Sequence, residues 1–169
     1  MALIDGMLQE FEQETQTTRR VLERVPDNQL AWRPHEKART LGELALHVAM
    51  VPGGVAELVA SPSPAQAPQF TDPSPKSASE LIPALDQSIA KVKKVLGGMD
   101  DAALMATWRL MKGDRELLAV PRVAMLRSVM LNHWYHHRGQ LAVYLRLLDV
   151  PVPVIYGRSA DENPFATAA

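Results

Sequence analysis

The segment from Pro121 to Leu148 predicts one long helix, and it limits what this chain can fold into more than any other part of the sequence. Pro121 suits the first position of a helix, where its missing N–H is not needed. Val150-Pro151-Val152-Pro153 then stops the helix. Because the apolar face of such a helix needs other helices to cover it, the segment predicts a helical bundle.

Two further helices precede a proline-rich segment. Residues 1–25 carry apolar or small side chains at steps of three and four residues, the stripe of an amphipathic helix. Thr40 and Glu43 form a capping box, in which hydroxyl and carboxylate satisfy free backbone amides, so the second helix starts near Leu41. Pro52-Gly53-Gly54 lies inside this helix and predicts a kink or a break there.

A long crossover follows the second helix. From Ser61 to Ser79 the composition shifts to Pro and Ser, and neither flank could build a core alone, so this segment connects parts of one domain. The third helix starts near Ser79 and ends at the stop signal Gly97-Gly98. Residues 100–106 predict one short helical turn, and residues 107–120 predict two extended pieces around a turn at Lys112-Gly113-Asp114.

These elements together predict the fold class. Four helices, two of them long, joined by at least one long crossover, predict an all-α chain that folds as an antiparallel four-helix bundle of up-down-up-down sense. We expect the whole chain, residues 1–169, to form a single domain, because its length is typical of one hydrophobic core.

The chain of 169 residues contains no cysteine. A disulfide framework, a thiolate zinc site, an iron–sulfur cluster and a cysteine nucleophile are therefore excluded. Any metal must be bound by nitrogen and oxygen ligands, among which histidine is the first to consider.

The charge balance narrows the classes of partner. Eighteen basic side chains stand against 19 acidic ones, for a formal net charge of −1. Proteins that mainly bind nucleic acid or anionic membranes carry an excess of positive charge, so we expect neither partner. The N-terminus lacks a basic signal region. The longest uncharged helical stretch, Leu44 to Ala56, is shorter than the ~20 residues that cross a bilayer. We expect a cytoplasmic protein.

The long fourth helix carries two histidines on its apolar face. On a helical wheel at about 100° per residue, His133 and His137 point to the centre of that face, beside Leu126 and Met130. Imidazoles one turn apart have Cβ atoms about 5–6 Å from each other and can direct nitrogens at one ion about 2.0–2.1 Å away. Because neutral imidazoles in an apolar interior need partners for their ring nitrogens, the pair indicates a metal site.

Other polar side chains lie around this pair. Gln140 and Tyr144 share its face, where they either orient ligands and substrate or serve as plain polar core contacts. His136 lies about 60° to one side and is a candidate for proton transfer. We expect Arg138 and Arg146 to point away from the core.

His47 on the second helix offers a third nitrogen. A lone histidine at the edge of an apolar face is more often a hydrogen-bonded core residue, so both interpretations stay open at this point. Three protein ligands with open positions are typical of catalytic metal sites. Trp134 stands where a zincin helix places its glutamate base, so that chemistry is excluded. His35, beside Pro34 in a loop, is expected at the surface.

Several motifs occur in a specific order along the chain: Leu30-Ala31-Trp32-Arg33-Pro34-His35, then Thr40-Leu41-Gly42-Glu43-Leu44, then His136-His137-Arg138-Gly139-Gln140. This order resembles the DinB/YfiT-like metalloenzyme superfamily over nearly the whole chain, and the His-His-Arg-Gly-Gln run is its most specific part. Pro52-Gly53-Gly54 departs from the family pattern, as does Asp149, which stands where a helix-ending glycine is more usual.

The resemblance implies a four-helix bundle that binds a divalent metal, commonly zinc or nickel. One histidine of the second helix and two histidines of the fourth, four residues apart, are the ligands, and they match His47, His133 and His137. His136 does not match a ligand position. The resemblance further implies a homodimer and, among characterised relatives, thiol-dependent transferases and isomerases that use bacillithiol, mycothiol or glutathione.

We therefore expect a metal-dependent enzyme that activates a small-molecule thiol, as an S-transferase or a thiol-dependent isomerase, or that activates water. His136, Gln140 and Tyr144 are the candidate catalytic residues beside the three histidine ligands. The alternative is a non-catalytic, metal-binding dimeric bundle that acts as a stress-response binding module. This alternative stays open because no residue of the sequence is an unambiguous general base.

Overall fold

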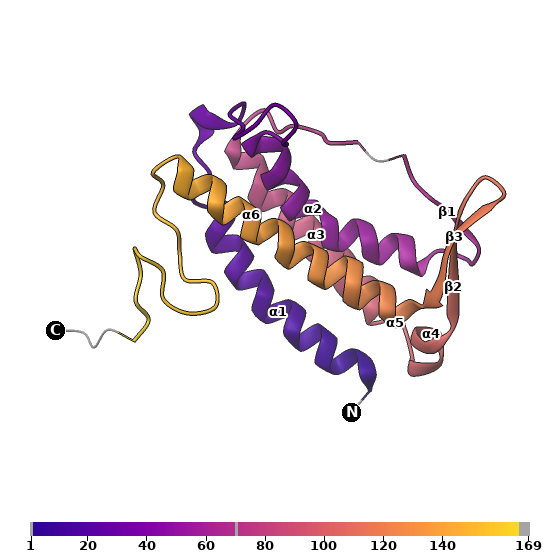
Figure 1. Ribbon diagram of the computed structural model, residues 1–169. Coiled ribbons are helices and arrows are strands. Elements are labelled where there is room, and N and C mark those ends of the chain that lie inside the picture. Colours follow the sequence, from indigo (N-terminus) through magenta and orange to yellow (C-terminus); the bar gives the residue numbers. More distant parts are fainter. Residues whose placement is uncertain (1, 70, 166–169) are drawn as a thin grey trace.

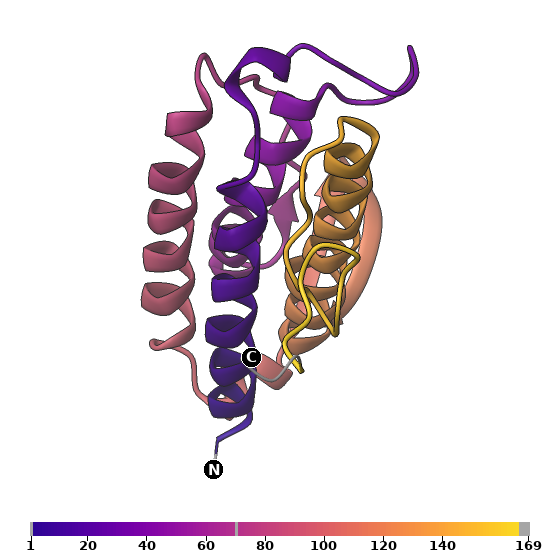
Figure 2. The same ribbon diagram turned by 90° about the vertical axis from the view of Figure 1, so that its left-hand side faces the viewer.

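The computed structural model describes residues 2–69 and 71–165, and most of them are helical (Figure 1). Four long helices lie along one another in both views (Figures 1 and 2). They are α1 (Leu3–Leu22), α2 (Leu41–Ala60), α3 (Leu81–Leu96) and α6 (His133–Leu147). α2 packs against α3 and α6, and α1 packs against the same two helices. Their inward faces form the hydrophobic core.

A small sheet lies at one end of the helices, so the prediction of an all-α chain is incomplete (Figure 1). It contains β1 (Ala65–Gln66), β2 (Thr107–Lys112) and β3 (Arg115–Pro121) in that order. β1 pairs with β2 in parallel, and β2 pairs with β3 antiparallel. The β2–β3 hairpin confirms the two predicted extended pieces. A two-residue strand such as β1 carries no sequence periodicity and forms only where β2 offers an edge.

The crossover changes the expected direction of one helix. It returns the chain to the end where α2 began, so α3 runs in the same direction as α2, while α1 and α6 run the opposite way (Figures 1 and 2). The predicted up-down-up-down sense is therefore wrong for α2 and α3, which are parallel. A connection from Ser61 to Ser77 is long enough to span a helix of this length, which a short turn is not.

Local signals place the helix ends as expected. The Thr40 hydroxyl accepts from the Glu43 amide at 3.1 Å, and the Glu43 carboxylate accepts from the Thr40 amide at 2.7 Å, which confirms the capping box. Asp149 follows α6 with a φ of 57°, a left-handed conformation in which glycine would be more comfortable. Short turns lie between the long helices: η1 (Asp27–Gln29), η2 (Ala78–Glu80) and α4 (Asp101–Met105).

α2 continues through Pro52 without the break that its sequence suggests. Proline has no N–H, so the carbonyl of Val48, four residues earlier, loses its helical donor. The indole N–H of Trp134 on α6 donates to this carbonyl at 2.8 Å. Next to the proline, the Gly53 amide donates to the Ser88 hydroxyl of α3 at 2.7 Å. The hydrogen bonds around Pro52 thus connect α2 to both α6 and α3.

Glycine is required at position 53 by the close approach of α3. A Cβ there would lie 2.8 Å from the Ser88 Cα and 3.0 Å from its carbonyl oxygen. Gly53 and Ser88 are both buried, so the two helices pack with almost no space between their backbones.

The fourth long helix is continuous but not uniformly α-helical. It consists of α5 (Arg122–Met125), the π-helix η3 (Leu126–Asn132) and α6, and Pro121 is the last residue of β3 rather than part of the helix. A π-helix closes its hydrogen bonds over five residues and so winds more residues into each turn than an α-helix. A wheel drawn at a constant angle therefore misplaces the faces on the two sides of η3.

The buried stripe of α6 accordingly has Trp134 and Leu141 near its centre, with His137 at one edge and the half-buried His133 beside it. Trp134, His137, Arg138, Leu141 and Leu145 are buried, His133 is half-buried and Leu147 is 58% exposed. The prediction that His133 and His137 occupy the centre of the apolar face is wrong. They line its edge, where α6 meets α2.

Arg138 reverses another expectation, because its side chain is buried in the core and only 1% exposed. The guanidinium forms an ion pair with Glu14 of α1 and donates to the Thr18 hydroxyl at 3.1 Å. It also lies 5.2 Å and 5.1 Å from the ring centroids of Tyr135 and Tyr156. Sequence reasoning failed here because a buried guanidinium needs a carboxylate from another helix, and the pairing with α1 is visible only in three dimensions.

α2 is long and apolar enough to cross a membrane by length and composition alone. Half of its most apolar window is buried inside the protein, as is usual for a core helix of a bundle.

We expect Trp134→Phe to destabilise the protein by about 1–3 kcal/mol, because the buried Val48 carbonyl is then left without a donor. In the Pro52→Ala background the same change should cost about 1 kcal/mol less, because alanine has a backbone N–H that restores the helical donor to Val48. Urea unfolding of the two single variants, the double variant and the parent measures this coupling.

A control for this cycle is Trp108→Phe, because the Trp108 indole nitrogen is buried and has no hydrogen-bond partner among the described residues. Its cost should not change in the Pro52→Ala background. Equal costs of Trp134→Phe in both backgrounds would contradict the assigned role of the hydrogen bond.

Candidate metal centre

Three histidines from two helices meet at the boundary between α2 and α6. The ring centroids of His47 and His133 lie 5.4 Å apart, those of His47 and His137 lie 4.5 Å apart, and those of His133 and His137 lie 4.3 Å apart. One ring nitrogen from each residue lies within 4.8 Å of the other two. The i,i+4 pair of α6 and one residue of α2 therefore form the predicted group.

Hydrogen bonds set the tautomers of the α6 pair. His137 Nδ1 lies 2.7 Å from the Gln140 side-chain oxygen, which can only accept, so this nitrogen carries the proton. His137 Nε2 is then an acceptor, and His133 Nε2 donates to it at 2.8 Å. His133 Nδ1 has no hydrogen-bond partner among the described residues. When the proton sits on this nitrogen instead of on His133 Nε2, the Nε2 lone pairs of both histidines are available to a metal ion.

His47 provides the strongest local indication that a ligand belongs here. Its Nε2 is buried and has no hydrogen-bond partner among the described residues. A buried polar atom without a partner costs free energy, and a cation within reach of three imidazoles would remove that cost. Three neutral nitrogen donors with no cysteine suit a divalent ion such as zinc or nickel.

The electrostatic environment keeps the cluster neutral. Burial, with the positive charge of Arg39 next in importance, lowers the pKa of His47 from 6.5 to about 4. Burial also lowers the pKa of His137 to about 4, although the hydrogen bond to Gln140 opposes the shift. The pKa of His133 is lowered by burial and by His136. Metal binding requires deprotonated imidazole, so the site is prepared for a cation at neutral pH.

Two pockets open on the histidines from different sides. The apolar pocket, of about 470 Å³, has His47 and His133 in its wall. The polar pocket, of about 380 Å³, has His137, Gln140 and Tyr144 in its wall. An ion at the three nitrogens would therefore be accessible from both pockets.

The three candidate catalytic residues occupy different places. Gln140 contacts a histidine directly, as described above. Tyr144 lines the polar pocket, donates to the Arg39 carbonyl at 3.3 Å and packs edge-on against Trp32. His136 is exposed and lines neither pocket, although its ring centroid lies 5.0 Å from that of His137. His35 is at the surface, as predicted.

Sequence reasoning missed Arg39 and Asp72. The Arg39 side chain lines both pockets and is bound by the Asp72 carboxylate at 2.7 Å. Asp72 belongs to the proline-rich crossover, which thus forms part of the site. The only local signal for Arg39 is its position directly before the helix-capping Thr40, and no such signal exists for Asp72.

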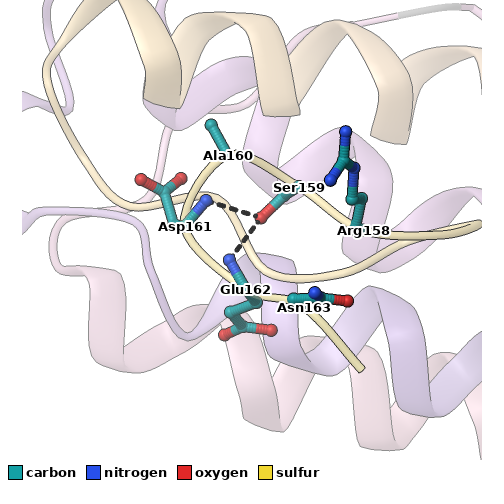
Figure 3. A pocket seen from close by; sticks show the side chains of 6 residues that line it. All are labelled: Arg158, Ser159, Ala160, Asp161, Glu162 and Asn163. Atoms are coloured by element: carbon teal, nitrogen blue, oxygen red, sulfur yellow. Dashed lines mark hydrogen bonds between the residues drawn. The ribbon is translucent and has the colours of Figure 1, made fainter. Parts of the chain in front are cut away.

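A third hollow, of about 490 Å³, lies in the C-terminal segment and contains none of the histidines (Figure 3). The Ser159 hydroxyl accepts from the amides of Asp161 and Glu162 at 3.1 and 2.9 Å and donates to the Val152 carbonyl at 2.7 Å. These hydrogen bonds join residues of the same loop, so its polar groups stabilise the conformation of the loop.

Comparison with known proteins shows the family of the chain. The model of the DinB family matches residues 2–164, and the chain belongs to this family. The chain is 28% identical over 162 residues to the uncharacterized protein YrdA of Bacillus subtilis (strain 168), covering 94% of this chain and 91% of that protein.

Two crystal structures share the fold. A DinB-like protein from Bacillus cereus ATCC 10987 superposes with a TM-score of 0.72 at 24% identity, over 90% of this chain and 97% of that one. The DinB-like protein YjoA from Bacillus subtilis superposes with a TM-score of 0.66 at 19% identity, over 88% and 96% of the two chains. Family membership and the three-histidine group are together compatible with metal binding.

We expect Gln140→Leu to weaken zinc binding about tenfold, because His137 loses the acceptor that orients its ring and fixes its tautomer. Zinc titration against a competing chelator measures the change. Tyr144→Phe is the matched control, because the Tyr144 hydroxyl donates to a backbone carbonyl and forms no hydrogen bond with an imidazole of the described residues. An unchanged zinc affinity in Gln140→Leu would contradict the role of the hydrogen bond.

The metal-free protein should lose stability as the pH falls from 6.5 to about 4. In this window the unfolded chain protonates His47 and His137 while the folded protein does not, so acid favours unfolding. Each residue should contribute on the order of 1 kcal/mol after screening by solvent. Urea unfolding across the window should show a shallower pH dependence for His47→Gln and His137→Gln than for the parent and His35→Gln.

Proposed function

We propose that this protein is a metal-dependent enzyme that uses His47, His133 and His137 to hold a divalent metal, zinc or nickel, and acts on a small-molecule thiol. The observation that supports it most is the buried Nε2 of His47, which has no hydrogen-bond partner among the described residues and lies beside two imidazoles whose pKa values are lowered. When bound, such a metal lowers the pKa of a coordinating thiol or water.

The residues of the chain would position the reactants. Lys37 and Arg39 in the wall of the polar pocket suit an anionic, water-soluble thiol, and their charge exceeds that of Asp72. Gln140 holds the His137 ring in place through the contact with Nδ1. In the transfer reaction the thiol sulfur forms a bond to an electrophilic carbon, the leaving group departs with its electron pair, and the thiol proton goes to solvent.

The formal net charge of −1 also favours a small molecule over a nucleic acid as the substrate. Within this proposal the chain acts in the cytoplasm and forms a homodimer, and the family resemblance supports only the second of these two properties. Water as the nucleophile would give a hydrolase with the same three ligands, and a metal-binding module without turnover would use them for stability alone.

The first test is the metal content of tag-free protein, measured by plasma mass spectrometry after dialysis. We expect about one divalent metal per parent chain and less than about one tenth of that in His47→Ala, His133→Ala and His137→Ala, because two imidazoles bind far more weakly than three. His35→Ala is the control and should retain the parental content. Metal that stays near-stoichiometric in His137→Ala would overturn the assigned ligands.

The second test separates an enzyme from a binding module. Glutathione, bacillithiol and mycothiol are each incubated with a panel of electrophiles and the metal-loaded protein, and conjugates are quantified by mass spectrometry. Turnover that disappears in the metal-free protein and in His137→Ala supports the proposal. Stoichiometric metal binding without turnover for any thiol would contradict the enzymatic part and favour the binding module.

A further inference from the structure

The space between α2 and α6 changes its chemistry at the histidines. Towards the N-terminal end of α2 it is polar, with Lys37, Asp72 and Tyr144 in the wall of the polar pocket. Beyond the histidines the wall is formed mainly by aliphatic side chains. The three histidines thus stand at a boundary between two environments that suit different parts of a ligand, or different ligands.

The aliphatic residues of this wall lie on the same helix faces as the proposed metal ligands. On α2, Val51 and Val55 follow His47 at steps of four residues, and Leu58 follows one turn later. On η3, Val129 precedes His133 by four residues. All four aliphatic side chains are only partly buried, so they present apolar surface to the pocket instead of filling it.

The remaining wall leaves the pocket open for a ligand. Pro68 of the crossover closes one side. Gly54 also lines the pocket, and a Cβ added there would meet no atom within 4 Å. At about 470 Å³ the pocket is large enough for a small hydrocarbon group, and its polar contribution comes from Arg39 and the two histidines.

We propose that the apolar pocket binds the hydrocarbon part, an alkyl chain or an aromatic ring, of the electrophilic substrate. Its reactive carbon then lies next to His47 and His133, while the polar thiol enters on the side of His137. This assignment rests on the proposed function for the identity of the reaction, but the apolar pocket itself requires no bound metal. It implies that the protein selects electrophiles by their apolar surface rather than by hydrogen bonds.

A series of alkyl hydroxamic acids tests the pocket in the zinc-loaded protein. The probes are acetohydroxamic, butanohydroxamic, hexanohydroxamic and octanohydroxamic acid, and their dissociation constants are measured by calorimetry. We expect the affinity to rise about fourfold for each methylene group, the usual gain for burying a CH₂ in apolar surroundings. Affinities that do not depend on chain length would overturn the inference and leave metal binding intact.

Gly54→Leu adds a bulky side chain at the edge of the pocket without removing any of its walls, and leucine is a better helix former than glycine. We expect this variant to bind octanohydroxamic acid about fifteenfold more weakly, the equivalent of about two buried methylene groups, and acetohydroxamic acid unchanged. Gly6→Leu is the matched control: position 6 on α1 also has no atom within 4 Å of an added Cβ and lines neither pocket. Equal losses in both variants would contradict the assignment.

A measurement without metal separates this inference from the proposed function. Octanamide, which lacks the chelating hydroxyl group, is titrated into metal-free protein with labelled valine and leucine methyl groups. We expect chemical-shift changes at Val51, Val55, Leu58 and Val129. If the protein fails to bind metal but these methyl signals move, the pocket stands and the metal proposal fails. If the signals stay fixed, the pocket assignment is overturned.

Discussion

The hydrogen bond from the Trp134 indole to the Val48 carbonyl determines how the two ligand-bearing helices meet. Pro52 leaves this carbonyl without a helical donor, and a buried carbonyl must find another. Trp134 is fully buried, and its ring centroid lies 5.4 Å from that of Phe11. Its N–H therefore also needs a buried acceptor. Val48 is the neighbour of His47 in the chain, and Trp134 is the neighbour of His133. The bond that satisfies both groups therefore also brings the histidines together.

The burial that stabilises the helices also prepares the histidines for a cation. Imidazoles that are largely removed from water and lie near Arg39 are poorly solvated when charged, so the neutral form is favoured in all three. The neutral form is the one that coordinates a metal. Arg138, directly after His137, is fully buried and paired with Glu14 of α1, so this part of α6 is bound to α1 as well as to α2. The part of α6 that carries the histidines is thus held by contacts on two sides.

Much of the fold and of the site could be predicted because it depends on local periodicity. The capping box, the helix stripes, the hairpin around Gly113 and the i,i+4 pair of His133 and His137 are all local patterns. The direction of α3, strand β1 and the partners of Arg138 could not be predicted, because each depends on groups distant in sequence. The π-helix η3 was also missed, and with it the true core face of α6, since a wheel assumes a constant angle per residue.

Residue identity alone restricted any metal site to nitrogen and oxygen ligands, because the chain has no cysteine. The spacing of four residues between His133 and His137 placed two imidazoles within reach of one ion. Tertiary structure decided which third histidine joins them, since His47 approaches only when α2 packs on α6. It also decided what surrounds the site: Arg39, Asp72 and the crossover border it, and a polar and an apolar pocket open on its two sides. Spacing along a helix acts over one or two turns, whereas the surroundings of a site depend on how separate segments pack.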